Sequence, residues 1–349
     1  MKIKAGILGC TGAVGQKLIS LLANHPDFEI SEIAASENSA GKVYENVVNW
    51  KESVPIPDSV RRKTIYKCEP GLDATILFSG LDSSVAGEIE AEFAKAGYIV
   101  VSNSKNHRME EDVPLIVPEV NSSHFKLIET QKKRWNSGGF IVTNPNCSTI
   151  ALAVSLCTIY KNFGLKKVII TTMQAISGAG YPGVPSMDIL GNVVPHIKDE
   201  EEKIETETLK ILGSLQNGKI SFADFKISAF CNRVPVRDGH MISVSLETAK
   251  TAKKDEIIKS FSDIDNFNLN FSPEKVIGYF DDPFRPQPLL DALMDKGMRV
   301  SVGNLRRCNV LDWKFTVLGH NTIRGAAGAA ILNAEWLLHY GYMERGSSR

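Results

Sequence analysis

The sequence predicts an α/β protein in which a doubly wound parallel sheet is followed by an α+β domain with a mixed sheet. Through roughly the first 145 residues, short apolar runs alternate with helical stretches, which is typical of a parallel sheet covered by helices. Further along, β-branched runs follow one another without a crossover helix between every pair, which favours a mixed or antiparallel sheet with helices on one face. A chain of 349 residues is also too long for one ordinary core, so two domains are expected.

The first domain is expected to begin with a strand, a glycine-rich loop and a helix. The strand covers residues 3–8 and the helix residues 14–24. The next expected elements are strands over 28–35, 74–79 and 98–102, with a helix over 85–96. These strand segments are short apolar runs, as in strands that are buried on both faces.

The second domain is expected to supply the mixed sheet, with β-branched runs over residues 167–174, 225–229, 241–248, 298–302 and 313–318. The last run leads into a long helix over 324–340, which starts with glycines and alanines at 325–330. A helix that begins with such small side chains can pack very close to another backbone or to a flat ring. Tight packing of the helix on a sheet explains these small residues equally well. We assign residues 1–145 and the C-terminal helix 323–343 to the first domain, and residues 146–322 to the second.

Composition narrows the classes of function. The formal net charge is zero, which argues against nucleic acid as the main partner because such proteins usually carry a basic excess. No uncharged apolar run reaches about 18 residues and no signal-peptide pattern is present, so no membrane partner is expected. The six cysteines are scattered without metal-ligand spacing, which favours reduced thiols in a cytoplasmic protein and no metal site. Residues 346–349 are expected to form a frayed tail.

A glycine motif follows the first strand, with the spacing Gly9-x-x-Gly12-x-x-Gly15. Between a strand and a helix, this pattern is typical of a Rossmann dinucleotide site. Gly9 permits the tight turn, Gly12 lets the pyrophosphate approach the helix N-terminus, and Gly15 lets the helix pack on the strand. A tight turn without a ligand is the alternative. The expected cofactor contacts here are Gly9, Thr11, Gly12, Ala13 and Val14.

The end of the second strand bears on the choice between NAD and NADP. An acidic residue there would bind the ribose 2′-hydroxyl of NAD. Residues 36–42 instead offer the hydroxyls of Ser36 and Ser39, an amide and a lysine, which suit the 2′-phosphate of NADP. Glu37 opposes this interpretation because a carboxylate repels a phosphate. NADP is favoured, and a solvated polar loop is the alternative.

Cys147 lies where a helix is expected to begin, between a polar segment at 144–149 and an apolar helical run at 150–160. The amide groups and the macrodipole of a helix N-terminus stabilise a thiolate, so we expect a lowered pKa and an exposed thiol. Cys68, Cys157 and Cys308 are expected to be small buried hydrophobic residues.

A reactive cysteine needs a base, and His240 is the histidine best placed to supply one. It follows a turn signal and stands at the start of the expected strand over residues 241–248. His25 and His339 are expected at the surface. The remaining histidines stay open as alternatives: His107, His124, His196 and His320.

These motifs resemble the aspartate-semialdehyde dehydrogenase family, in the branch found in archaea and fungi. The resemblance extends from Lys4 to about Tyr342, nearly the whole chain. Its marks are residues 9–15, 39–42, 102–108, 113–121, 144–149, 174–183, 200–203, 231–240, 285–288 and 320–325. Where relatives often carry a basic residue, this chain has Glu37 and Asn38, which weakens the preference for NADP.

The resemblance implies NADPH-dependent reductive dephosphorylation of L-4-aspartyl phosphate to L-aspartate 4-semialdehyde and phosphate through a cysteine thioester. This reaction lies on the route to lysine, threonine, methionine and isoleucine. The resemblance makes Cys147 the nucleophile and His240 the acid/base, while Gln174 orients the acyl group. It also implies a homodimer or homotetramer that assembles through the flat apolar sheet of the second domain.

The remaining site residues follow from the same resemblance. Arg233 pairs with the substrate carboxylate, Glu200 receives the ammonium, and Lys203, Arg108 and Asn103 form the phosphate site, with Asn146 beside them. Ser177, Gly178, Gly180 and Asn321 match contacts to the nicotinamide half of the cofactor. A substrate with a carboxylate, an ammonium and an acyl phosphate needs such an arginine, a carboxylate and a second cationic pair. By spacing alone, Glu200 and Lys203 would be an ordinary surface pair on a helix.

Three alternative functions share parts of this set of motifs. A malonyl-CoA reductase shares the cysteine and histidine, but a CoA thioester has no α-ammonium for Glu200 to bind. An N-acetyl-glutamyl-phosphate reductase shares the glycine loop and cysteine, but an acylated amine would also leave Glu200 without a cation. A non-catalytic NADP-sensing protein has no reason to keep Cys147, His240 and Arg233 together.

Overall fold

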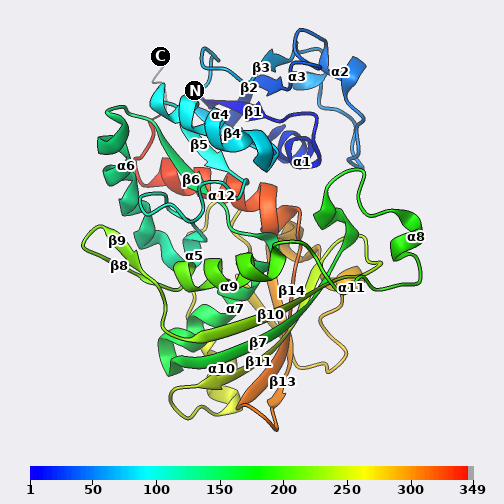
Figure 1. Ribbon diagram of the computed structural model, residues 1–349, viewed down its shortest axis with the longest axis vertical. Coiled ribbons are helices and arrows are strands. Elements are labelled where there is room, and N and C mark those ends of the chain that lie inside the picture. Colours follow the sequence, from blue (N-terminus) through cyan, green and yellow to red (C-terminus); the bar gives the residue numbers. More distant parts are fainter. Residues whose placement is uncertain (345–349) are drawn as a thin grey trace.

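Two six-stranded sheets organise the chain in the computed structural model, which describes residues 1–344. Figure 1 shows the N-terminal sheet in the upper part of the molecule and the second sheet in the lower part. The expected tail at 346–349 lies outside the described residues. The α/β fold with a parallel sheet followed by a mixed sheet is confirmed.

The first sheet is parallel throughout, with the strand order β3-β2-β1-β4-β5-β6. Its strands are β1 (Ile3–Leu8), β2 (Phe28–Ala35), β3 (Tyr66–Lys67), β4 (Ile76–Ser79), β5 (Ile99–Ser102) and β6 (Phe140–Thr143). All residues of β4, β5 and β6 are buried, as expected for strands with helices on both faces. The order reverses between β1 and β4, and ligands of open α/β sheets bind at such a point.

Helices surround this sheet, and one of them comes from the end of the chain (Figure 1). They are α1 (Ala13–Leu22), α2 (Tyr44–Val47), α3 (Asp58–Arg61), α4 (Ser83–Lys95), α5 (Pro118–Asn121), α6 (Leu127–Trp135) and α12 (Gly328–His339). Ile331, Ala334 and Leu337 of α12 share a hydrophobic core cluster with β1 and β2. The C-terminal helix therefore completes the core of the N-terminal sheet.

The start of the C-terminal helix differs from the expected continuous helix over 324–340. Residues Ile323–Ala327 form a π-helical turn, in which the N–H groups of Gly325 and Ala327 donate to carbonyls five residues earlier. The expected close backbone approach is present: a Cβ added to Gly325 would lie 2.6 Å from the Cβ of Cys147. The small residues at this start therefore allow the turn to pack against the N-terminus of another helix.

The second sheet is mixed, with the order β10-β7-β11-β14-β13-β12. Its strands are β7 (Leu165–Gln174), β10 (Lys226–Arg233), β11 (His240–Thr248), β12 (Ile277–Phe280), β13 (Val300–Arg307) and β14 (Trp313–Gly319). The two outer pairs, β10–β7 and β12–β13, are parallel and the inner pairs are antiparallel. β10 and β13 both extend further than expected at their C-terminal ends, to Arg233 and Arg307.

Helix α7 (Cys147–Phe163) packs across one face of this sheet, with α10 (Lys254–Ser260) beside it. The alternation along β7 matches this arrangement, since Val168 and Ile170 are buried while Ile169 is 50% exposed. Helix α9 (Glu200–Ile211) packs on β10 and α7. The remaining elements are α8 (Ser186–Ile189), α11 (Pro288–Asp291) and the hairpin of β8 (Ser214–Gln216) and β9 (Lys219–Ser221).

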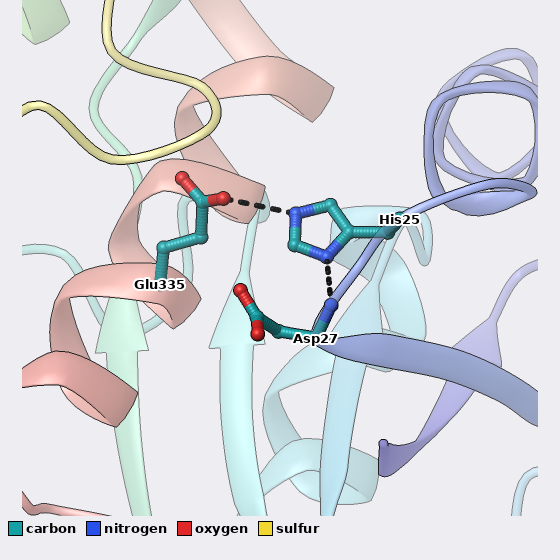
Figure 2. A group of neighbouring side chains, drawn as sticks. All are labelled: His25, Asp27 and Glu335. Atoms are coloured by element: carbon teal, nitrogen blue, oxygen red, sulfur yellow. Dashed lines mark hydrogen bonds and ion pairs between the residues drawn. The ribbon is translucent and has the colours of Figure 1, made fainter. Parts of the chain in front are cut away.

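His25, expected at the surface, is only 2% exposed. Figure 2 shows its ring between Asp27 and Glu335 of α12. The Nδ1 atom accepts from the backbone N–H groups of Asp27 (3.1 Å) and Phe28 (3.3 Å), and Nε2 lies 2.9 Å from Glu335 Oε1. The other oxygen of Glu335 accepts from the Phe271 N–H at 2.9 Å. The expectation was wrong because a partner 310 residues away buries this histidine.

The same contacts argue against a metal ion at this group. His25, Asp27 and Glu335 bring one ligand atom each to within 4.8 Å of one another. However, Nδ1 of His25 accepts hydrogen bonds, so the proton of the neutral ring is on Nε2, and that nitrogen has no lone pair for a metal. We infer that this group has a structural role, because it joins the segment before β2 to α12.

Replacement of Glu335 by alanine should destabilise the protein by at least about 2 kcal/mol, because each buried donor left without a partner costs about 1–3 kcal/mol. Thermal unfolding measures this, with Glu88→Ala on the exposed face of α4 as the control. Addition of EDTA or Zn²⁺ should leave the melting temperature of the unmodified protein unchanged. A metal-dependent rise in melting temperature that Glu335→Ala removes would contradict the tautomer argument.

Candidate active site

The N-terminus of α7 places Cys147 at the first position of the helix, as the sequence predicts. The preceding residue, Asn146, is the N-cap, and its side-chain oxygen accepts from the N–H groups of Ser148 (2.9 Å) and Thr149 (3.3 Å). Pro145 precedes this cap in the loop that leaves β6. The local sequence therefore fixes where the helix begins.

Asn146 also reaches Glu200 at the start of α9. Its side-chain amide donates to Glu200 Oε1 at 2.7 Å, while Glu200 Oε2 lies 2.6 Å from Lys203 Nζ. The expected pairing of Glu200 and Lys203 on one helix face is present, although Glu200 is buried rather than on a solvated surface. Three of the expected substrate-binding residues therefore meet next to Cys147.

The expected phosphate-site residues are joined through a carboxylate that the sequence reasoning missed. Arg108 donates from Nη1 to Glu207 Oε1 (2.8 Å) and from Nη2 to the Asn103 carbonyl (2.8 Å). Glu207 Oε2 accepts from the backbone N–H of Asn146 at 2.6 Å. The signal was available: positions 200, 203 and 207 fall on one face of an α-helix. The side-chain amide of Asn144 adds a contact to Asn103 Oδ1 at 2.9 Å.

Arg233 and His240 meet at the edge of the second sheet. β7 and β10 are parallel, with Arg233 in register with Gln174, and β11 begins at His240 on the same edge. The backbone of Ala175 links the two side chains: its carbonyl accepts from Arg233 Nη1 (2.8 Å), and its N–H donates to His240 Nδ1 (3.0 Å). A Cβ added to Gly178 would lie 2.8 Å from His240 Nε2, so only glycine allows that loop to approach so closely.

A cavity of about 1420 Å³ between the two domains collects most of the expected site residues. The expected residues that line it are Ala13, Val14, Asn103, Arg108, Asn146, Cys147, Ser177, Gly178, Gly180, Glu200, Lys203, Arg233 and Asn321. The expected residues outside its lining are Gly9, Thr11, Gly12, Ser36, Ser39, Gln174 and His240. One cavity thus connects the glycine loop with Cys147.

Gln174 and His240 lie behind the cavity wall, both buried. The Gln174 amide nitrogen is 3.3 Å from Thr172 Oγ1, so it reaches a neighbour on its own strand. Among the alternative histidines, His320 lines the cavity, His196 is exposed, and His107 and His124 are buried outside the lining.

The glycine loop has the geometry that a dinucleotide site requires. Gly9 has φ +75°, a conformation that favours glycine, and a Cβ on Gly15 would collide with the Gly9 carbonyl oxygen. Gly12 is the N-cap of α1 and has no comparably tight contact, with its nearest atom at 3.4 Å. Gly9 and Gly15 therefore shape the loop, whereas a Cβ at Gly12 would make only an ordinary van der Waals contact.

In the loop after β2, the carboxylate of Glu37 is paired with a lysine of the neighbouring strand. Glu37, the residue that opposes NADP, has its Oε1 atom 3.2 Å from Lys67 Nζ of β3. Lys42 donates to the Asn38 carbonyl at 2.7 Å, and the Ser39 N–H donates to the Ser36 carbonyl at 2.9 Å. Lys67, which the sequence reasoning missed, adds a second cation to this end of the sheet.

The electrostatics of Cys147 differ from the expected low-pKa thiol. Burial raises the pKa of the Cys147 thiol to about 12, and Glu200 raises it further, while Arg233, Arg108 and Lys203 act in the opposite direction. The favourable field of the helix N-terminus is worth only about 0.3–1 kcal/mol and does not outweigh this desolvation. In the free protein the thiol is therefore neutral near pH 7.

His240 is also neutral in the free protein. Burial lowers the pKa of its ring to about 3, and the nearby guanidinium of Arg233 lowers it further. Since Nδ1 accepts from Ala175, the proton of the ring is on Nε2. The other cysteines also differ from expectation, because Cys68, Cys157 and Cys308 are partly exposed rather than fully buried.

Comparison with protein families places two models on the chain. The model described as "Semialdehyde dehydrogenase, NAD binding domain" matches residues 4–128, and "Semialdehyde dehydrogenase, dimerisation domain" matches residues 156–324. Among curated relatives, the aspartate-semialdehyde dehydrogenase of Archaeoglobus fulgidus is 49% identical over 97% of this chain and 98% of the relative. The enzyme of the same name from Schizosaccharomyces pombe is 46% identical, covering 97% of this chain and 99% of the relative.

Solved structures give the same picture. The aspartate semialdehyde dehydrogenase of Candida albicans, crystallised with NADP, superposes with a TM-score of 0.90 at 41% identity, covering 98% of this chain and all of that one. The aspartate semialdehyde dehydrogenase II of Vibrio cholerae, complexed with ASA, has a TM-score of 0.77 at 26% identity, with 98% of this chain and all of that one covered.

Alkylation of Cys147 by iodoacetamide in the free protein should become about tenfold faster with each pH unit between about pH 7 and pH 10, because only the thiolate reacts. Glu200→Gln should accelerate alkylation across this range, since the Glu200 carboxylate raises the pKa of the thiol. Peptide mapping by mass spectrometry isolates the signal of Cys147, and Glu201→Gln is the neighbouring control. A rate that reaches a plateau near neutral pH would show a thiolate in the resting protein.

Proposed function

The chain belongs to the aspartate-semialdehyde dehydrogenase family, and we propose that Cys147 and His240 carry out its NADP-dependent reaction in the cavity between the two domains. The reaction is reductive dephosphorylation of L-4-aspartyl phosphate to L-aspartate 4-semialdehyde and phosphate, a step toward lysine, threonine, methionine and isoleucine. One observation carries the assignment of residues: Cys147 lines a cavity together with Arg108, Lys203, Glu200 and Arg233.

The relatives and the cavity do not support the alternative functions. The relatives described above are nearly full-length matches and carry one name, aspartate-semialdehyde dehydrogenase, rather than malonyl-CoA reductase or N-acetyl-glutamyl-phosphate reductase. The buried carboxylate of Glu200 at the cavity suits an α-ammonium, which neither rival substrate offers. A non-catalytic sensor would not need a cysteine among three cationic side chains.

Three charged groups of the substrate have matching partners. We assign Arg233 to the α-carboxylate, where a guanidinium can form a bidentate contact, and Glu200 to the α-ammonium. Arg108 and Lys203, with Asn103, receive the phosphate group. Lys203 contacts Glu200 in the free protein, so a bound substrate would take over one side of this ion pair.

Attack by Cys147 is the first chemical step. The partly exposed thiol of Cys147 first loses its proton to water. The thiolate sulfur then bonds to the acyl carbon, the bond from that carbon to the phosphate oxygen breaks, and phosphate leaves while a thioester remains on Cys147. Glu200 raises the pKa of the thiol in the free protein, so an ammonium paired with Glu200 offsets that effect. The substrate thus helps to create the thiolate that attacks it.

We assign the Nε2–H group of His240 as the donor for the oxygen of the reacting carbonyl. The Nε2 atom of His240 carries a proton and is buried without a hydrogen-bond partner among residues 1–344, so this proton is not committed to another group of the protein. The backbone N–H groups of Ser148 and Thr149 donate to Asn146 Oδ1, so they are not free to bind this oxygen. When bound, NADPH supplies the hydride to the thioester carbon. The oxyanion then collapses, the carbon–sulfur bond breaks, and Cys147 is released as a thiolate with the aldehyde.

The residues around the glycine loop fit the cofactor. We place the pyrophosphate at Gly9, Thr11, Gly12, Ala13 and Val14, and the 2′-phosphate near Ser36, Ser39 and Lys67. The nicotinamide half would contact Ser177, Gly178, Gly180 and Asn321. The side-chain amide of Asn321 donates to Ser177 Oγ at 2.7 Å, and its oxygen accepts from the Gly239 N–H at 2.9 Å, which holds this wall beside His240.

The second sheet offers a surface for assembly. Its uncovered face exposes Ile169 by 50% and Phe230 by 65%, and the matching family model is described as a dimerisation domain. We propose a homodimer or homotetramer through this face. We also propose a division into residues 1–145 with 323–343 and residues 146–322, and a cytoplasmic location. Within residues 1–344 no helix is both long enough and apolar enough to cross a membrane.

Replacement of Cys147 by serine should abolish turnover and leave NADP binding nearly intact, because the nucleophile is lost while the glycine loop is unchanged. The assay follows NADPH formation from aspartate semialdehyde, phosphate and NADP, and fluorescence titration measures NADP binding. Reduction of malonyl-CoA by NADPH is measured in parallel as the test of the alternative malonyl-CoA reductase function. Retained turnover in Cys147→Ser would remove this residue from the mechanism.

Replacement of His240 by asparagine should lower kcat by roughly 10²–10³-fold, the usual cost of losing one donor to the reacting oxygen, because asparagine has no donor at the position of Nε2. The KM for phosphate should change much less, because His240 is not placed at the phosphate group. Steady-state rates at saturating NADP measure both parameters. As a comparison, His320→Asn tests the histidine that lines the cavity, and a larger loss there would exchange the two assignments.

A further inference from the structure

Glu207 is a buried carboxylate that no step of the proposed chemistry uses. It is 2% exposed and lies on the same face of α9 as Glu200 and Lys203. Its two oxygens have different partners: Oε1 accepts from Arg108 Nη1 at 2.8 Å and Oε2 from the backbone N–H of Asn146 at 2.6 Å. The carboxylate therefore joins the proposed phosphate-binding arginine to the residue directly before Cys147.

Burial of a carboxylate is costly unless its charge is paired and its oxygens are hydrogen-bonded. Arg108 alone would neutralise the charge of Glu207. The second contact, to an amide at the N-cap of α7, fixes the position of that turn relative to the guanidinium. Both contacts bridge distant parts of the chain, 99 and 61 residues apart.

Arg108 keeps donors for a ligand after these contacts. A guanidinium has five N–H donors, and the contacts to Glu207 and to the Asn103 carbonyl occupy one each on Nη1 and Nη2. Arg108 also lines the cavity beside Cys147 and Lys203. The guanidinium of Arg108 is thus fixed by Glu207 and by the Asn103 carbonyl. Arg108 also borders the cavity in which phosphate would bind.

We propose that Glu207 is a positioning residue that holds Arg108 and the turn carrying Cys147 in one fixed arrangement, so that the phosphate group and the acyl carbon are presented together. This inference rests on the proposed roles of Arg108 and Cys147. Such an arrangement matters because a displacement of about 1 Å of a reacting group can cost about 100-fold in rate.

Glu207→Gln tests this directly. A glutamine side chain has one acceptor oxygen, and its NH2 group, which can only donate, replaces the other. It therefore cannot accept from Arg108 and from the Asn146 amide on two separate oxygens as Glu207 does. We expect kcat/KM for phosphate to fall by about 10- to 100-fold in the direction that consumes aspartate semialdehyde. The KM for NADP should stay within about twofold, because the glycine loop does not contact Glu207.

A second measurement does not depend on turnover. Inorganic phosphate should protect Cys147 of the unmodified protein from iodoacetamide, and Glu207→Gln should need about tenfold more phosphate for equal protection. The matched control is Glu205→Gln on the same helix, whose carboxylate accepts from the Ala229 N–H at 2.8 Å and does not line the cavity. Its melting temperature can fall, but its phosphate dependence should not change.

Glu207→Asp covers the case in which the glutamine variant does not fold, because it keeps the charge and shortens the reach. A phosphate-specific loss in this variant supports the proposal, and kinetics like those of Glu205→Gln overturn it. An equal rise in the KM for NADP and for phosphate also overturns it, because the effect would then be general. Absence of phosphate-dependent turnover in the unmodified protein would instead contradict the proposed function.

Discussion

The hydrogen bonds of Asn146 fix the geometry on which the rest of the site depends. Its side-chain oxygen caps α7, its side-chain amide holds Glu200, and its backbone N–H donates to Glu207. A single residue thus sets the start of the helix and the distance from that helix to α9. Because Cys147 is the next residue, its position follows from all three contacts at once.

The cavity lies where the ends of strands from the two sheets come together. β6 of the first sheet leads into the N-terminus of α7, while β7 and β10 of the second sheet end beside the start of β11. Side-chain-free positions allow the close approach at this junction. Gly178 lies against His240, and Gly325 lies against Cys147, so the substrate cavity is bounded by backbone on two sides.

Burial governs the chemistry of the free protein. It raises the pKa of Cys147 to about 12 and lowers the pKa of His240 to about 3, so both groups are neutral before a ligand binds. The carboxylate of Glu200 contributes to the first of these shifts. In the mechanism that we propose, activation depends on ligand charges that enter the cavity, which would link substrate recognition to the ionisation of Cys147.

The sequence by itself determined the local features: the β1–loop–α1 unit with Gly9 and Gly15, the start of α7 at Cys147, and the alternation of strands and helices. These depend on residues close together in the chain, so periodicity and turn chemistry suffice to predict them. The resemblance supplied the set of site residues, most of which line one cavity. Only the tertiary structure decided the burial of His25 by Glu335, the neutral state of Cys147, the π-turn at Ile323–Ala327 and the bridging role of Glu207. Each of these arises from packing between distant segments, where desolvation and partner geometry outweigh local preference.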